Sequence, residues 1–148
     1  MKYLYLFIYL CFAYANTAFA QTFPMLTYDA RRTDKGLVIK KVTITKQYTI
    51  CDMFYTYSPK DNETAESFIY IVQDMHIYDI KTQAKYYVIK TENIPMQPGS
   101  HGFKKEGEFL RFKVFFPRID PMKTLIFHIL EDNDRGFKFY NVRLMPVA

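Results

Sequence analysis

The segment "FLRFKVFFPRI", residues 109–119, alternates between two kinds of side chain: Arg111 and Lys113 stand between apolar neighbours. Successive side chains of a β-strand point to opposite faces, so this period of two predicts a strand with one buried and one exposed face. Almost no window of the chain repeats apolar residues every three to four positions, as an amphipathic helix would. The chain is therefore limited to a fold built mainly from strands.

Composition and turn signals agree with this pattern. Aromatic residues make up 18% of the chain, all of them Tyr or Phe, which favour strands. Further strand-like runs, each bounded by a turn signal, occupy residues 36–50, 51–58, 67–82, 84–95, 123–130 and 136–147. Roughly seven to nine short strands at this spacing predict an antiparallel sandwich or barrel rather than an alternating βα layout. Of these two we expect the all-β, antiparallel sandwich of two sheets.

The first twenty residues, "MKYLYLFIYLCFAYANTAFA", have the pattern of a cleavable signal peptide. Lys2 gives a positive start, an apolar run follows from Tyr3 to Tyr14, and small residues flank Phe19. The run is shorter than the roughly 20 apolar residues of a membrane span. We expect residues 1–20 to be removed, leaving one sandwich domain over 21–148. The protein is then exported to the periplasm, the outer membrane or the outside of the cell.

Cysteine and charge exclude some protein classes. Cys11 leaves with the leader, so Cys51 is the one thiol of the mature chain and no internal disulfide can form. Its flanking residues alternate as on a strand, which favours a buried structural thiol. Basic pairs such as Lys40-Lys41 and Lys104-Lys105 are scattered along the chain. A nucleic-acid binder is expected to concentrate them on one stripe, so we expect no nucleic-acid partner.

Glu131, Asp132 and Asp134 form the densest acidic cluster, in "HILEDNDRGFKFYNVRL". A calcium loop would need a central glycine and a closing Glu, but Gly136 comes too late and no acid closes the loop. A glycosidase pair must face across a cleft, whereas neighbours on one turn point apart. The Asn-Asp-Arg-Gly sequence is typical of turns, so we interpret this segment as a hairpin connection without a metal. We expect its acids to lie at the solvent boundary, where a strand ends.

The histidines give no catalytic or metal-binding pattern. His76 and His128 lie in strand-like runs, and His101 lies in a loop. A zinc site needs three or four convergent ligands, usually with a close-spaced pair, which is not visible here. Ser100-His101 suggests a nucleophile and base, but no G-x-S-x-G motif surrounds it. We therefore expect no enzyme activity, no catalytic residue and no cofactor.

Two sets of residues are candidates for binding. The irregular segment 96–108 carries His101, Lys104 and Lys105, which are suited to an acidic partner. Tyr86 and Tyr87 are candidates for an aromatic platform that stacks on a sugar ring.

Three segments carry a resemblance to a known family: "VTITKQYTICDMFYTYS", "FIYIVQDMHIYDIKTQAKYYVIKTENIP" and "FKVFFPRIDPMKTLIFHILEDNDRGFKFYNVRL". Together they resemble small secreted immunoglobulin-like sandwich domains of Bacteroidetes-type bacteria. The resemblance implies an immunoglobulin-like sandwich without intrinsic catalysis. That family often has glycine after its last aromatic pair, where this chain has Asn141 after Phe139-Tyr140.

Three hypotheses about function follow. The leading one is a non-catalytic exported interaction module, an accessory subunit of an outer-membrane or periplasmic assembly that meets the membrane only through its partner. The alternative is a carbohydrate-binding module, although the chain has no Trp. The third is a secreted hydrolase that uses Ser100-His101 or the acids of Glu131–Asp134.

Overall fold

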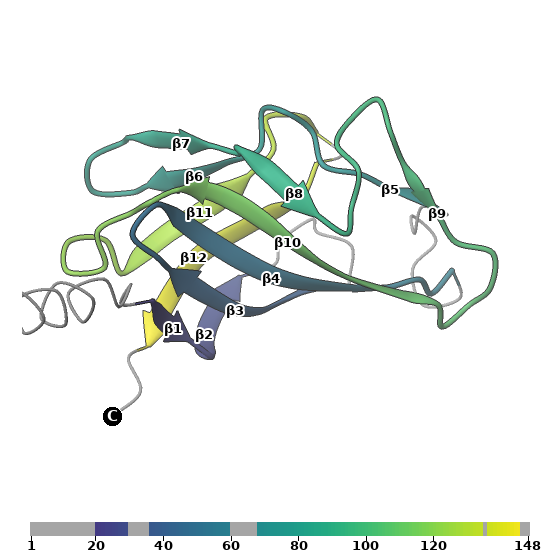
Figure 1. Cartoon of the computed structure of the whole chain (residues 1–148), viewed down its shortest axis with the longest axis horizontal. Helices are drawn as coiled ribbons and strands as arrows, with labels where there is room; N and C mark the ends of the chain where they lie inside the picture. Colours follow the sequence, from purple (N-terminus) through teal and green to yellow (C-terminus); the bar gives the residue numbers. More distant parts are fainter. Residues whose placement is uncertain (1–19, 30–35, 60–67, 135, 146–148) are drawn as a thin grey trace, which may run out of the picture.

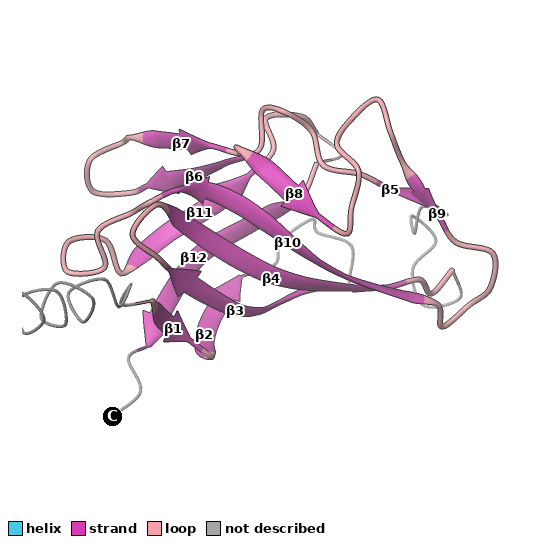
Figure 2. Cartoon of the chain, viewed as in Figure 1, coloured by secondary structure: helices cyan, strands magenta, loops and turns pink. Residues whose placement is uncertain are grey.

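The protein is built from β-strands (Figures 1 and 2). The computed structural model describes residues 20–29, 36–59, 68–134 and 136–145, and no helix occurs among them. The strands are β1 (Gln21–Phe23), β2 (Met25–Asp29), β3 (Leu37–Ile44), β4 (Tyr48–Thr56), β5 (Phe68–Ile69), β6 (His76–Asp79), β7 (Lys85–Tyr87), β8 (Lys90–Glu92), β9 (His101–Gly102), β10 (Phe109–Pro117), β11 (Ile126–Leu130) and β12 (Lys138–Met145). The all-β prediction is confirmed.

Ten of these strands form two five-stranded antiparallel sheets that face each other. The front sheet, nearer the viewer in Figure 1, has the order β1-β3-β4-β10-β8. The back sheet has the order β2-β12-β11-β6-β7, and β5 and β9 pair separately. The predicted antiparallel sandwich of two sheets is therefore present.

Chain segments that pass from one sheet to the other lie at both edges of the sandwich. β1 belongs to the front sheet and β2 to the back sheet, with only Pro24 between them. At the opposite edge the chain leaves β7 of the back sheet and enters β8 of the front sheet. Val88 N–H donates to the Met75 carbonyl, and Ile89 N–H donates to the Phe115 carbonyl, so the crossing stays hydrogen-bonded. Such corners tie the two sheets of a sandwich together.

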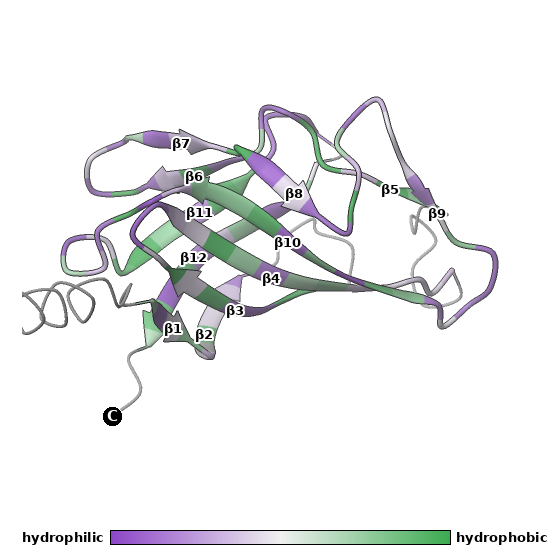
Figure 3. Ribbon diagram, viewed as in Figure 1, coloured by the Kyte–Doolittle hydropathy of each residue, from purple (hydrophilic) through white to green (hydrophobic). Residues whose placement is uncertain are grey.

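The core lies between the sheets and follows from the period-two alternation. Along β3 the buried residues are spaced so that one face turns inward, and β10 alternates in the same way (Figure 3). The front sheet supplies Leu37, Ile39, Val42, Ile44, Cys51, Met53, Tyr55, Leu110, Phe112, Val114 and Phe116; the back sheet supplies Ile77, Phe127, Ile129, Phe139, Val142 and Leu144.

The number and bounds of the strands differ from the prediction. Residues 36–50 were expected to form one strand, but the chain turns at 45–47 between β3 and β4. The Thr45 hydroxyl accepts the N–H groups of Gln47 (3.2 Å) and Tyr48 (2.9 Å), a side-chain turn that apolar alternation does not reveal. Five of the twelve strands have only two or three residues, too few to show a period.

Asn141 explains one irregularity of β12. Its φ is 52°, and the pairing of β12 with both neighbours shifts register near it. Asn tolerates this left-handed conformation better than most residues, and glycine adopts it freely. A glycine or an asparagine at this position is therefore consistent with the bulge.

The expected signal peptide lies, apart from Ala20, outside the described residues, and its cleavage stays a prediction. Within the described part of the chain, no helix has the length and apolar character needed to span a membrane.

Candidate interaction surface

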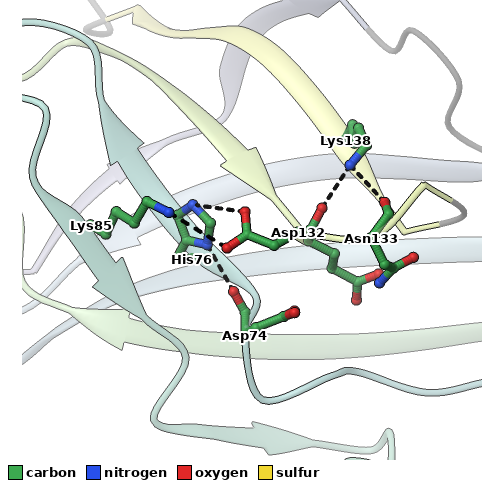
Figure 4. Close-up of polar contacts among 7 residues, drawn as sticks. Asp74, His76, Lys85, Asp132, Asn133 and Lys138 are labelled. Carbon is green, nitrogen blue, oxygen red and sulfur yellow. Dashed lines mark hydrogen bonds and ion pairs between the residues drawn. The ribbon is translucent and has the colours of Figure 1, made fainter.

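The acidic segment connects β11 to β12, which confirms the predicted hairpin. The strands on the two sides of the connection, β11 and β12, pair in antiparallel orientation. At the base of the connection, Glu131 N–H donates to the Phe137 carbonyl at 3.0 Å. The Lys138 ammonium donates to the carbonyls of Glu131 (2.7 Å) and Asn133 (2.8 Å), which fixes the turn from within (Figure 4).

Glu131 differs from the expectation that the acids of this turn lie at the solvent boundary. It is buried, and its Oε2 accepts Phe137 N–H at 2.9 Å. Its Oε1 is buried without a hydrogen-bond partner among the described residues. Burial raises the pKa of Glu131 to about 7, and the nearby Asp74 carboxylate adds to the rise, although the Phe137 amide and Lys138 oppose it. Asp132 and Asp134 are exposed, as expected.

Asp132 lies between two positively ionisable side chains (Figure 4). Its Oδ2 is 3.5 Å from Lys85 Nζ, and its Oδ1 is 3.9 Å from Nε2 of the buried His76. His76 Nδ1 lies 2.7 Å from the Asp74 carbonyl, which assigns the ring proton to Nδ1 as a donor. Over the described ranges, no three His, Cys, Asp or Glu side chains are arranged to hold a metal ion.

Cys51, His128 and His101, the other residues with reactive or ionisable side chains considered above, lie in different strands. Cys51 is fully buried in the middle of β4, as expected, and burial raises the pKa of its thiol further above its ordinary value. His128 lies on the outer side of the back sheet, and its ring stacks on that of Tyr78 with the ring centroids 5.9 Å apart. Partial burial lowers the pKa of His128. His101 lies in the short strand β9 rather than in a loop, with its ring edge-on to Phe103.

Tyr86 and Tyr87 are successive residues of β7 and so point to opposite faces of the back sheet. Tyr86 packs against the core, whereas Tyr87 is 47% exposed beside His76. The two rings therefore do not form one shared platform.

The predicted loop of His101, Lys104 and Lys105 is ordered by an acid. Glu108 accepts the backbone N–H groups of Lys104 (3.1 Å) and Lys105 (3.0 Å). Both lysine side chains are exposed, and His101 is half-buried. The structure keeps these residues near one another, with Glu108 reducing the local positive charge.

A larger cationic surface lies on the outer face of the front sheet. Lys41 and Lys113 lie opposite Asp52 from the two sides, and Arg111 lies opposite Phe54. These residues alternate with buried neighbours, so they share the outer side. The cations of this "front face" are Lys40, Lys41, Lys90, Arg111 and Lys113, and its acids are Asp52 and Glu92.

Aromatic rings lie between these cations. Phe54 and Phe109 stack at a centroid distance of 5.1 Å, and Lys40 Nζ lies 5.5 Å from the Phe54 centroid. Phe109 is 64% exposed, so the stack is open to solvent on one side.

A second cationic and aromatic group lies farther along the same face. Lys90 Nζ lies 4.6 Å from the Phe115 centroid and 5.4 Å from the Tyr48 centroid. Attraction of a cation to a ring face stabilises each arrangement. The front face therefore combines positive charge with apolar contact area.

No protein-family model, curated protein or solved structure matches the chain. The resemblance to secreted immunoglobulin-like domains stays a prediction, and the candidate surface rests on the chain's own residues.

Sequence reasoning did not identify the front face. Alternation predicts that Arg111 and Lys113 point outward, and the structure agrees. It does not indicate that Lys40, Lys41 and Lys90 lie beside them, because that depends on the pairing of β3, β4, β10 and β8. A scattered charge in the sequence thus becomes a concentrated one in the fold.

Proposed function

We propose that the protein is a non-catalytic, exported interaction module that binds an acidic segment of a partner protein, as an accessory subunit of an envelope assembly. One observation carries this proposal: five cations from β3, β10 and β8 share the front face with only two acids.

Charge and exposure support a protein partner. Asp52 is buried and lies 4.0 Å from Lys41, and Glu92 lies opposite Lys113, so five cations against two acids leave the front face three positive charges in excess. Arg111 and Lys113 are exposed, and the open Phe109 ring on the same side of β10 adds apolar area beside them. Complementary charge speeds association, and aromatic and Arg side chains are enriched in the centres of protein interfaces.

Capture from an envelope extract tests the proposal with a matched pair of variants. Arg111→Glu/Lys113→Glu reverses two exposed charges on the front face. Lys104→Glu/Lys105→Glu makes the same charge change in the loop before β10. We expect the front-face variant to bind the captured partner at least about tenfold more weakly than wild type, since close charge pairs at an interface contribute on the order of 1.5 kcal/mol or more.

The loop variant should bind within about twofold of wild type, because Lys104 and Lys105 lie in the loop before β10 and are not part of the front face. Loss of binding in the loop variant alone would move the site to His101, Lys104 and Lys105. Capture that is equal in all three proteins would refute a charge-based front-face interaction. Circular dichroism and urea unfolding show that each variant is folded before binding is compared.

A further inference from the structure

Three connections from both sheets meet at one end of the sandwich. They are the β3–β4 turn (45–47), the β6–β7 turn (80–84) and the β10–β11 loop (118–125), which lie at the left end of Figure 1. Arg118 Nε–H donates to the Thr45 carbonyl at 3.1 Å, and the Thr124 hydroxyl donates to Asp79 at 2.7 Å. We call these three connections together the loop end.

The loop end exposes large apolar side chains. Met122 is 89% exposed, and Ile80 and Leu125 are 41% and 40% exposed. Three of the seven exposed large hydrophobic residues among the described positions therefore lie at this end. Ile80 follows Asp79, and Leu125 follows Thr124, so the side-chain hydrogen bond between Asp79 and Thr124 links the two segments that carry them.

Asp120 fixes the backbone of the turn that carries Met122. The Asp120 carboxylate accepts Met122 N–H at 2.9 Å, and the Asp120 carbonyl accepts the N–H groups of Lys123 and Thr124. Buried Pro121 and Thr124 lie on the two sides of Met122 and Lys123. The exposed apolar tip is thus part of a hydrogen-bonded turn.

The same three connections also carry cations. The exposed ones are Lys46, Lys81, Arg118 and Lys123. The acids of the same connections are few: Asp79 is buried, and Asp120 is half-buried and lies 3.9 Å from Lys123. The opposite end of β6 and β11 instead carries the exposed acids Asp74, Asp132 and Asp134. The two ends of β6 and β11 therefore differ in the sign of their exposed charges.

We propose that the loop end docks directly on an anionic lipid bilayer, with Met122 inserted among the headgroups. An exposed apolar side chain at an end that also carries exposed cations fits such a surface, because the apolar tip leaves water while the cations meet anionic headgroups. The hydrogen-bonded turn presents this tip already ordered, so little conformational entropy is lost on docking. This surface is separate from the front face and does not depend on the partner proposed there.

Flotation with lipid vesicles tests the proposal. The protein, purified after export, is mixed with vesicles of phosphatidylcholine alone or with phosphatidylglycerol added. Wild type should float with the anionic vesicles, bind the neutral ones at least about tenfold more weakly, and lose binding as salt is raised. Equal binding to both vesicles, or binding to neither, overturns the proposal.

Charge-reversal variants locate the surface. Lys81→Glu/Lys123→Glu should weaken binding to the anionic vesicles at least about tenfold, since each cation near an anionic surface contributes appreciably. Lys104→Glu/Lys105→Glu changes the net charge equally at another site and should stay within about twofold of wild type. Equal loss in the two variants would mean that net charge alone drives binding, and the docking site would be refuted.

A tryptophan reporter tests insertion itself. The chain has no Trp, so Met122→Trp supplies the single indole. Its emission should shift to shorter wavelength with anionic vesicles and be quenched by lipids brominated in their acyl chains. Phe109→Trp, on the front face, should show neither change. Unshifted indole emission from the vesicle-bound Met122→Trp variant would refute insertion at this tip.

Discussion

Thr124 and Asp79 join two connections of the sandwich through a buried hydrogen bond: Thr124 Oγ1 donates to Asp79 Oδ2 at 2.7 Å. Asp79 ends β6, and Thr124 precedes β11, so the bond links the β6–β7 turn to the β10–β11 loop. Asp79 Oδ1 also accepts the N–H groups of Lys81 (2.9 Å) and Thr82 (3.2 Å). One carboxylate thereby organises most of this end of the back sheet.

Replacing Thr124 by Val should destabilise the protein by about 1.5–3 kcal/mol, since a buried bond to a charged acceptor is lost. Thr124→Ser keeps the hydroxyl and should lose less. Urea unfolding at neutral pH measures both free energies. Equal stability of Thr124→Val and wild type would show that the bond contributes nothing net.

The same pair has a characteristic pH dependence. Burial alone would raise the pKa of Asp79, but hydrogen bonds from Thr124, Thr82 and Lys81 outweigh it and hold that pKa below the ordinary value of 3.8. A lowered pKa stabilises the fold above pH 3.8, and this contribution is lost as pH falls through the lowered value. The difference between wild type and Thr124→Val should therefore shrink in strong acid, as unfolding measured from neutral pH down to about pH 2 would show.

Ionisation of Glu131 should have the opposite effect on stability: it should destabilise the fold as pH rises. Its pKa rises from 4.5 to about 7 in the fold, so the unfolded chain releases this proton first and stability falls as pH rises from about 4.5 to 7. Glu131→Gln cannot ionise, yet its amide oxygen can still accept Phe137 N–H. At about pH 8 we expect this variant to be more stable than wild type by about 2–4 kcal/mol, and at about pH 4 to be similar.

Asp132→Asn serves as the control for Glu131→Gln, because the Asp132 side chain is 48% exposed and its ion pair with Lys85 is worth about 1 kcal/mol or less. A pH dependence that is the same in wild type and Glu131→Gln would contradict the assignment to Glu131.

Gly136 leaves no room for a side chain. A Cβ there would lie 2.5 Å from Glu131 Cβ and 2.7 Å from Glu131 Oε2. Gly136→Ala should therefore cost about 1–3 kcal/mol, as overpacking in a filled site does. Gly107→Ala, where a Cβ meets open space but φ is 85°, should cost about 1 kcal/mol through backbone strain alone. Thermal or urea unfolding compares the two.

Cys51 should resist thiol reagents while the protein is folded. It is fully buried, and its raised pKa removes the reactive thiolate at neutral pH. Mass spectrometry after iodoacetamide treatment should show modification of Cys51 at least about a hundredfold slower in the native protein than in guanidine. Rapid native labelling would mean that β4 opens readily.

Much of the fold could be predicted from local pattern. The alternation in 109–119 predicts a strand, and β10 occupies Phe109–Pro117. The turn chemistry after Leu130 predicts a hairpin, and β11 and β12 pair across it. These features depend on residues close in sequence, so a period and a turn signal are sufficient.

The candidate sites could not be predicted in the same way. Glu131 was expected at the solvent boundary with its neighbours, but it is buried and held by Phe137. Tyr86 and Tyr87 were grouped because they are adjacent, whereas a strand separates adjacent side chains to opposite faces. In each case the environment of a side chain depends on packing, which sequence distance does not report.

The sequence by itself determined the class of structure, because period-two alternation, turn residues and aromatic composition are local properties of the chain. Only the tertiary structure decided which charges act together. Lys40, Lys90 and Arg111 are far apart in the sequence, and they share a face because β3, β4, β10 and β8 lie side by side. The segments that carry Ile80 and Leu125 are likewise brought to one end by the Asp79–Thr124 bond. A charged or apolar surface depends on which side chains are close together in space. Strand pairing and contacts between loops bring those side chains together, and distance in the sequence does not reveal either.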